Sequence, residues 1–141
     1  PNPLGPGSVS YKVTAVSKDL VEGNASNIVT VTDSVKPRLI YFPAPVAAPG
    51  TNNWVYTIGF SEPMTQATSE NIGNYTMSSF GGVSYTINSA TYGGYDGVRW
   101  IVYLYVTSTN TPVAGYALTA TAAIVDLAGN SMDTAFNSHT Y

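Results

Sequence analysis

The acidic and amide side chains offer this sequence its clearest route to chemistry. Asp126 and Asn130 flank a tight turn, and Glu62 belongs to a second acidic motif. Calcium binds six to eight oxygen atoms drawn from carboxylates, amides and loop carbonyls, and Asp33 follows at the junction between two segments. These four residues predict a calcium site, although no EF-hand spacing is present. The alternative is that Asp126 and Asn130 cap their own turn through side-chain hydrogen bonds.

The sequence contains few residues of the types that usually carry catalysis. The chain has no cysteine, which excludes disulfides, zinc-thiolate sites and thiol nucleophiles. Its single histidine, His139, lies near the end of the chain, where a triad or a metal site would depend on one terminal residue. Paired carboxylates can hydrolyse glycosides, but no pattern in the sequence places such a pair. We therefore expect a protein that is not an enzyme.

The composition of the chain argues against nucleic acids and membranes as its partners. The 141 residues include only 9% charged residues, with a formal net charge of −3. A nucleic-acid ligand is not expected, because neutralising phosphates requires a basic surface. No run of 18 apolar residues exists, so no membrane insertion is expected. The chain begins at Pro1 with no leader pattern, so we expect a processed protein or a segment of a longer one.

The pattern of residues predicts an all-β fold. Thirteen glycines and nine prolines divide the chain into short runs, several of which alternate apolar and polar residues with period two. Residues 9–15 and 27–32 predict a hairpin, with a polar turn at 18–24. Further strands are predicted at 38–42, 54–60, 74–77, 83–90, 98–106, 116–124 and 135–141, with a helical turn at 68–73 and a hairpin turn at 93–97.

The first segment carries a family resemblance. The string SVSYKVTAVSKDLVEGNASNIVTVTD, residues 8–33, resembles the last two strands of a fibronectin type III domain. The resemblance implies that Tyr11 anchors a corner through its hydroxyl. We accordingly assign residues 1–34 to a partial domain of this kind, from which the first five strands are missing.

A hairpin of this length cannot shelter its own apolar face. The residues that require a partner are Val9, Tyr11, Val13, Val29 and Val31. The partner could be the upstream part of the same polypeptide, or a neighbouring subunit that accepts the strands by β-augmentation. The sequence leaves both open.

The second segment, residues 37–141, carries another resemblance. Its motifs are IGFSEPM (58–64), NIGNYT (71–76), ALTA (117–120) and IVDLAGN (124–130). Together they resemble bacterial Ig-like domains, which recur in surface-layer (S-layer) proteins, adhesins and large secreted proteins. The resemblance implies an Ig-like β-sandwich that acts as a spacer or assembly unit without catalysis.

Aromatic residues and two sequons complete the candidates. Trp54 and Trp100 follow the apolar side of their strands and are predicted to pack in the core. Tyr103 and Tyr105 lie on the opposite face, where either a second sheet covers them or they form an exposed patch. Asn24 and Asn74 begin glycosylation sequons that are either chance matches or modified in a secreted protein.

The expected function follows from these parts. We expect an extracellular, cell-surface structural module of a surface layer, fibre or adhesin that self-assembles through strand edges, strand donation and aromatic faces. Its partners would be copies of itself or adjoining domains of the same polypeptide. The alternative is an accessory polysaccharide-binding or spacer module of a secreted hydrolase.

Overall fold

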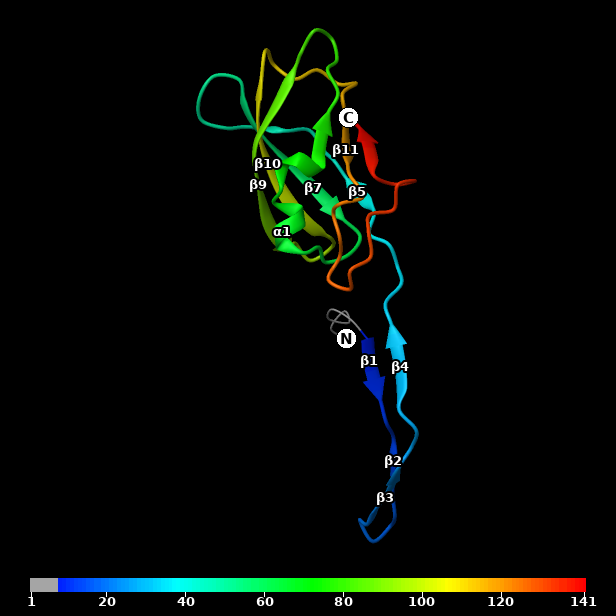
Figure 1. The fold of residues 1–141 in the computed structure, drawn as a ribbon. Coiled ribbons are helices and arrows are strands. Elements are labelled where there is room, and N and C mark those ends of the chain that lie inside the picture. The colour runs from blue at the N-terminus through cyan, green and yellow to red at the C-terminus, as the bar shows by residue number, and fades with distance from the viewer. Residues whose placement is uncertain (1–7) are drawn as a thin grey trace.

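The computed structural model describes the backbone of residues 8–141 and the side chains from Lys12 onward. This part of the chain is built almost entirely from antiparallel strands, which confirms the predicted all-β class. Figure 1 shows a two-layered body formed by the later strands and a long hairpin that extends away from it.

The hairpin consists of two short ladders in succession. Its strands are β1 (Ser8–Tyr11), β2 (Thr14–Val16), β3 (Glu22–Ala25) and β4 (Val29–Thr32). Strand β1 pairs with β4, and β2 pairs with β3. The predicted single strand over 9–15 is therefore interrupted, since the ladder breaks after Tyr11. The predicted polar turn over 18–24 is shorter, because Glu22 already begins a strand.

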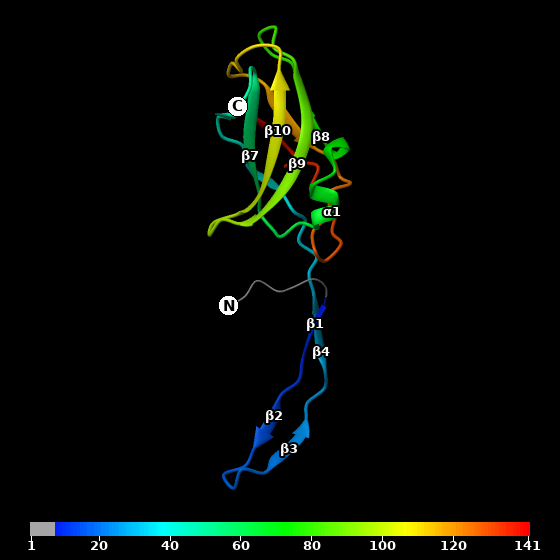
Figure 2. The ribbon, with the colours of Figure 1, turned by 90° about the vertical axis from the view of Figure 1, so that its left-hand side faces the viewer.

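The larger sheet contains five strands. They are β5 (Leu39–Tyr41), β6 (Val46–Ala47), β7 (Asn53–Phe60), β9 (Tyr85–Tyr95) and β10 (Trp100–Ser108). In the sheet, β7 pairs with β5, β6 and β10, and β10 pairs with β9. Figure 2 shows β7, β10 and β9 side by side. Apolar residues alternate along β7 and β10 because successive side chains point to opposite faces of a sheet, and the inward ones are fully buried.

The smaller sheet covers one face of the larger one. It is formed by β8 (Tyr75–Met77), β11 (Ala117–Ala120) and β12 (Ser138–Thr140), with β11 in the middle. A short helix, α1 (Gln66–Ser69), and a 3-10 turn at Ile72–Asn74 precede β8. The predicted helical turn over 68–73 is thus replaced by two shorter turns, of which the first begins two residues earlier and the second ends one residue later.

The core lies between the two sheets. From the larger sheet it contains Tyr56, Ile58, Phe60, Val102, Leu104 and Val106, and from the smaller sheet Leu118 and Ala120. The Tyr56 and Tyr116 rings meet edge to face at 5.6 Å, a favoured geometry for aromatic pairs. Among the residues whose side chains the structure describes, every buried core residue belongs to positions 39–132, so the hairpin from Lys12 onward contributes none of them.

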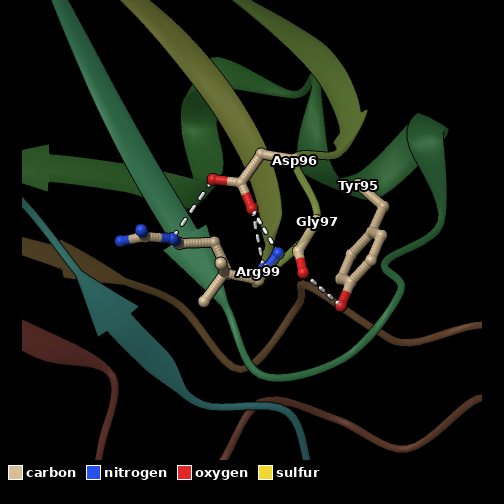
Figure 3. A network of polar contacts seen from close by, with 5 residues as sticks. Tyr95, Asp96, Gly97 and Arg99 are labelled. Carbon is tan, nitrogen blue, oxygen red and sulfur yellow. Dashed lines mark hydrogen bonds and ion pairs between the residues drawn. The ribbon is translucent and has the colours of Figure 1, made fainter.

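The turn between β9 and β10 is held by a compact polar network (Figure 3). Asp96 Oδ1 accepts hydrogen bonds from the backbone N–H groups of Val98 and Arg99, at 2.9 and 2.8 Å. Its other oxygen lies 3.2 Å from Arg99 Nε, and the Tyr95 hydroxyl donates to the Gly97 carbonyl at 3.0 Å. These backbone bonds hold the pKa of Asp96 below its usual value.

The turn that this network closes lies later in the chain than the predicted turn at 93–97. Residues 93–95, predicted as part of the turn, continue β9, while Val98 and Arg99, predicted as strand, belong to the turn. The predicted strand over 116–124 is also shorter. It ends at Ala120, after which Ile124 reaches the core from a turn.

Candidate functional site

The junction between the hairpin and the two-sheet body is tied down by backbone hydrogen bonds. The Asp133 N–H donates to the Pro37 carbonyl at 2.8 Å, and the Leu39 N–H donates to the Phe136 carbonyl at 2.9 Å. The Arg38 guanidinium lies 4.2 Å above the Phe136 ring and 3.3 Å from an Asp133 oxygen. The chain that leaves β4 is therefore fastened to the body within a few residues.

Three carboxylates meet at this junction. One oxygen each from Asp33, Glu62 and Asp126 lies within 4.8 Å of the others. Asp33 comes from the end of the hairpin, Glu62 follows β7, and Asp126 opens the turn after β11. The structure thus brings together residues from three distant segments that the sequence analysis had grouped as metal ligands.

The fourth predicted ligand plays a different part. The Asn130 backbone N–H donates to Asp126 Oδ1 at 2.7 Å, and its side-chain Nδ2 donates to Asp126 Oδ2 at 2.9 Å. The same Nδ2 lies 3.4 Å from the Asp33 carbonyl oxygen. In this structure Asn130 therefore presents a hydrogen-bond donor to the acidic cluster, and its part in a calcium site stays a prediction. The alternative, that Asp126 and Asn130 bond within their own turn, is what the structure contains.

Glu62 is the carboxyl most affected by the cluster. Its pKa is raised to about 7, first by burial and then by the negative charges of Asp33 and Asp126, while Arg38 acts in the opposite direction. Its Oε2 atom is shielded from solvent and has no hydrogen-bond partner within the described residues. A proton relieves the repulsion between these carboxyls, and a divalent cation with oxygen preference would relieve it as well.

The cluster is poorly placed for acid–base catalysis. Asp126 is only 2% exposed, and both of its oxygens already accept hydrogen bonds from Asn130. A hydrolytic pair of carboxyls must flank a substrate bond, which a buried and hydrogen-bonded Asp126 cannot do. Calcium binding by Asp33, Glu62 and Asp126 remains a prediction.

The hairpin exposes Val13, Val29 and Val31, three of the five apolar residues predicted to need a partner, while the side chains of Val9 and Tyr11 lie outside the described residues. Register pairs Val9 with Val31 and Tyr11 with Val29, so these four positions share one face of the β1–β4 ladder. The side chains of Val29 and Val31 are 60% and 45% exposed, and Val13 is 70% exposed. Within the described residues, neither ladder of the hairpin gains a third strand.

Tyr103 and Tyr105 lie on the outer face of the larger sheet. Their neighbours Val102, Leu104 and Val106 are buried against the smaller sheet, so the tyrosines point the other way. No other described sheet covers this face. Tyr103 is half-buried beside Gly93, whereas Tyr105 is 41% exposed.

A hollow next to Tyr105 was missed by the sequence analysis. It has a volume of about 280 Å³ and is lined by Ala48, Pro49, Asn53, Trp54, Asn88, Tyr105 and Val106. Its residues come from β7, β9 and β10 and the loop before β7. No local signal in the sequence joins these segments, because only the sheet brings them together.

The two sequons differ in accessibility. Asn24 lies in the exposed strand β3. Asn74 is 7% exposed, and its Nδ2 donates to the Thr68 carbonyl at 2.8 Å. A glycan requires that nitrogen to be accessible, so the structure argues against Asn74 as an acceptor in the folded chain.

Comparison with known proteins provides no relative for this chain. No protein-family model, curated protein sequence or solved structure matches it. In the part of the chain that the structure describes, no helix combines the length and apolar character needed to cross a membrane.

Proposed function

We propose that this chain is a non-catalytic structural module of an extracellular surface protein, such as a surface layer, fibre or adhesin. In this proposal the hairpin joins the module to a neighbouring β-domain, which is either a copy of itself or an adjoining domain of the same polypeptide. The two-sheet body acts as the rigid unit from which the hairpin projects.

The exposed hairpin is the observation that carries this proposal. Its strands pair only with one another among the described residues, and Val13, Val29 and Val31 remain exposed to solvent. An isolated two-stranded hairpin is marginal in water, so these residues favour burial against a further sheet. Strand addition would supply both backbone hydrogen bonds and an apolar cover.

Family resemblance supports the same function. In this proposal residues 1–34 are the end of a fibronectin type III-like domain, and residues 37–141 form an Ig-like sandwich. The two sheets with a shared core agree with a sandwich. The scarcity of charge, 9% of residues, suits a module whose surfaces pack against neighbours with little desolvation cost.

The acidic junction would add stiffness to such a module. Asp33 belongs to the hairpin side, whereas Glu62 and Asp126 belong to the body. A calcium ion bound by all three carboxylates would fix the direction in which the hairpin leaves the body. The predicted calcium site therefore fits a structural role better than a catalytic one.

Sedimentation velocity of the full chain tests the proposal. We expect association that strengthens with concentration and is lost in the Val29→Lys/Val31→Lys double variant, because charge on this face opposes burial. The matched control is Thr32→Lys, which places a lysine on the other face of the same exposed strand.

The control decides how the result is interpreted. The face of β4 that carries Val29 and Val31 is called the valine face. Association that survives in the double variant, or is lost equally in Thr32→Lys, would contradict docking through this face. If the chain is monomeric at every concentration measured, a second copy of the chain is excluded as the partner. The same variants are then compared in a longer polypeptide that includes an adjoining domain.

A further inference from the structure

We propose that the hollow beside Tyr105 binds a sugar ring of a neutral polysaccharide. This proposal goes beyond the structural role, because it concerns the body and does not depend on the hairpin. The hollow includes outer-face residues of the larger sheet, Asn53, Asn88 and Tyr105, reaches Trp54 and Val106 at the margin of the core, and shares no residue with the acidic junction.

The first argument is the kind of surface that the hollow presents. Tyr105, which is 41% exposed, lines the hollow together with Ala48 and Pro49. Apolar walls with a few fixed polar groups are typical of small-ligand sites. A pyranose has the matching character, with apolar C–H faces that pack on an aromatic ring and hydroxyls around its rim. The volume of about 280 Å³ suits a single ring more than a longer ligand.

The second argument is a β-bulge that places the side-chain amide of Asn88 at the hollow. Tyr105 pairs with Ser89 and Val106 pairs with Ile87, so Asn88 is the extra residue between them. Bulges commonly re-aim one side chain and are frequent beside functional sites. Here the bulge places the amide of Asn88 on the outer face, next to Tyr105.

A chain of hydrogen bonds then fixes that amide. Asn88 Nδ2 donates to Thr107 Oγ1 at 2.8 Å, and Thr107 Oγ1 donates to Asn53 Oδ1 at 3.1 Å. Asn53 Nδ2 in turn donates to the Pro49 carbonyl at 2.9 Å, which closes the loop at the rim. Asn88 is exposed, and within the described part of the chain no hydrogen bond to its Oδ1 is found, so this acceptor is available to a ligand hydroxyl.

Charge selects a neutral ligand. None of the seven lining residues carries a charge at neutral pH. An acidic polysaccharide would find no cation there, and a basic peptide would find no carboxylate. A peptide strand is also disfavoured, because the bulge at Asn88 interrupts the regular ladder that strand addition would extend.

Affinity gel electrophoresis of the full chain provides the test. The probes are three neutral polysaccharides, hydroxyethyl cellulose, xylan and glucomannan, with polygalacturonate as the charged comparison. We expect at least one neutral probe to retard the chain and polygalacturonate to have no effect. Tyr105→Ala and Asn88→Ala should each weaken binding by about tenfold or more.

Two controls separate binding from folding. Tyr105→Phe keeps the ring and should retain most of the retardation, whereas Tyr95→Ala removes an exposed tyrosine elsewhere and should retain all of it. Unchanged thermal unfolding of Tyr105→Ala would show that the fold is intact.

Three results would overturn the inference. They are the absence of retardation by any neutral probe, equal retardation of Tyr105→Ala and the unaltered chain, and preferential retardation by polygalacturonate. If Tyr105→Ala abolishes association between copies while no neutral probe retards the chain, the face is an interface between copies and the sugar site is refuted. The sedimentation test of the hairpin uses different variants, so the two proposals can fail separately.

Discussion

At the scale of single residues, Glu62 couples the stability of the fold to pH. Its pKa is about 7 in the folded chain, compared with 4.5 ordinarily. Between these values the folded chain retains a proton that the unfolded chain has lost. The free energy of unfolding should therefore fall as pH rises through this window and level off above it.

Glu62→Gln removes this dependence. In EDTA and above pH 7, the variant should be more stable than the unaltered chain by about 1 kcal/mol, once solvent screening of this half-buried group is allowed for. Urea unfolding measured on both sides of the window checks the prediction. A pH profile in the variant as steep as in the unaltered chain would contradict it.

Calcium should remove the destabilising repulsion between the ionised carboxylates of Asp33, Glu62 and Asp126. Adding calcium to the EDTA-treated chain should raise the melting temperature by about 2–8 °C, because binding to the folded state alone stabilises it. Asp33→Asn and Asp126→Asn should each reduce the shift, while Asp19→Asn, in the exposed turn of the hairpin, should leave it unchanged. A melting temperature insensitive to calcium in scanning calorimetry would remove the metal site.

The acidic site was partly visible in the sequence. Short motifs indicated Glu62 and Asp126, and the position of Asp33 at a segment junction suggested the third carboxylate. The orientation of Asn130 was not predictable, because a metal ion would attract its side-chain oxygen whereas the Asp126 carboxylate accepts a hydrogen bond from its nitrogen. The pKa of Glu62 depends on neighbours from distant segments, which spacing along the chain does not reveal.

At the scale of elements, β7 depends on a residue without a side chain. A Cβ at Gly59 would lie 2.6 Å from Arg99 Cδ and 2.8 Å from Tyr41 Cβ. Arg99 stacks on the Tyr41 ring at 3.6 Å and is also paired with Asp96, so neither neighbour can easily withdraw. Gly59 thus permits the β9–β10 turn to close over the outer face of β7.

Gly59→Ala should destabilise the fold by about 1–3 kcal/mol, the usual range for overpacking. Denaturant unfolding checks this, with Ser89→Ala on the same outer face as the matched control, expected within about 0.5 kcal/mol of the unaltered chain. A neutral effect of Gly59→Ala would mean that the Arg99–Tyr41 contact is not maintained in solution.

The strands were predicted more accurately than their ends. Alternation in residues 54–60 and 98–106 located β7 and β10, since their inward residues repeat with period two. The turn between β9 and β10 was displaced because Gly93 and Gly94 resemble turn residues, whereas the Asp96 side chain closes the actual turn. The bulge at Asn88 could not be predicted, because it depends on pairing with β10.

At the scale of the whole molecule, the hairpin and the body should be energetically separable. All buried core residues lie between Leu39 and Met132. A chain truncated to residues 35–141 should therefore keep the cooperative unfolding transition of the body and lose the effect of calcium, because Asp33 is removed. Thermal unfolding by near-ultraviolet circular dichroism checks this, and loss of the transition would show that the hairpin is required for the body to fold.

Amide hydrogen exchange over residues 8–32 tests the central proposal most directly. It would be measured by mass spectrometry on the 141-residue chain alone and on the intact protein as isolated from its source. We predict rapid exchange in the dilute chain, where the hairpin has no cover, and strong protection in the intact protein, where a neighbouring sheet buries the valine face. Equally rapid exchange in both samples would contradict the account of this segment as a docking element.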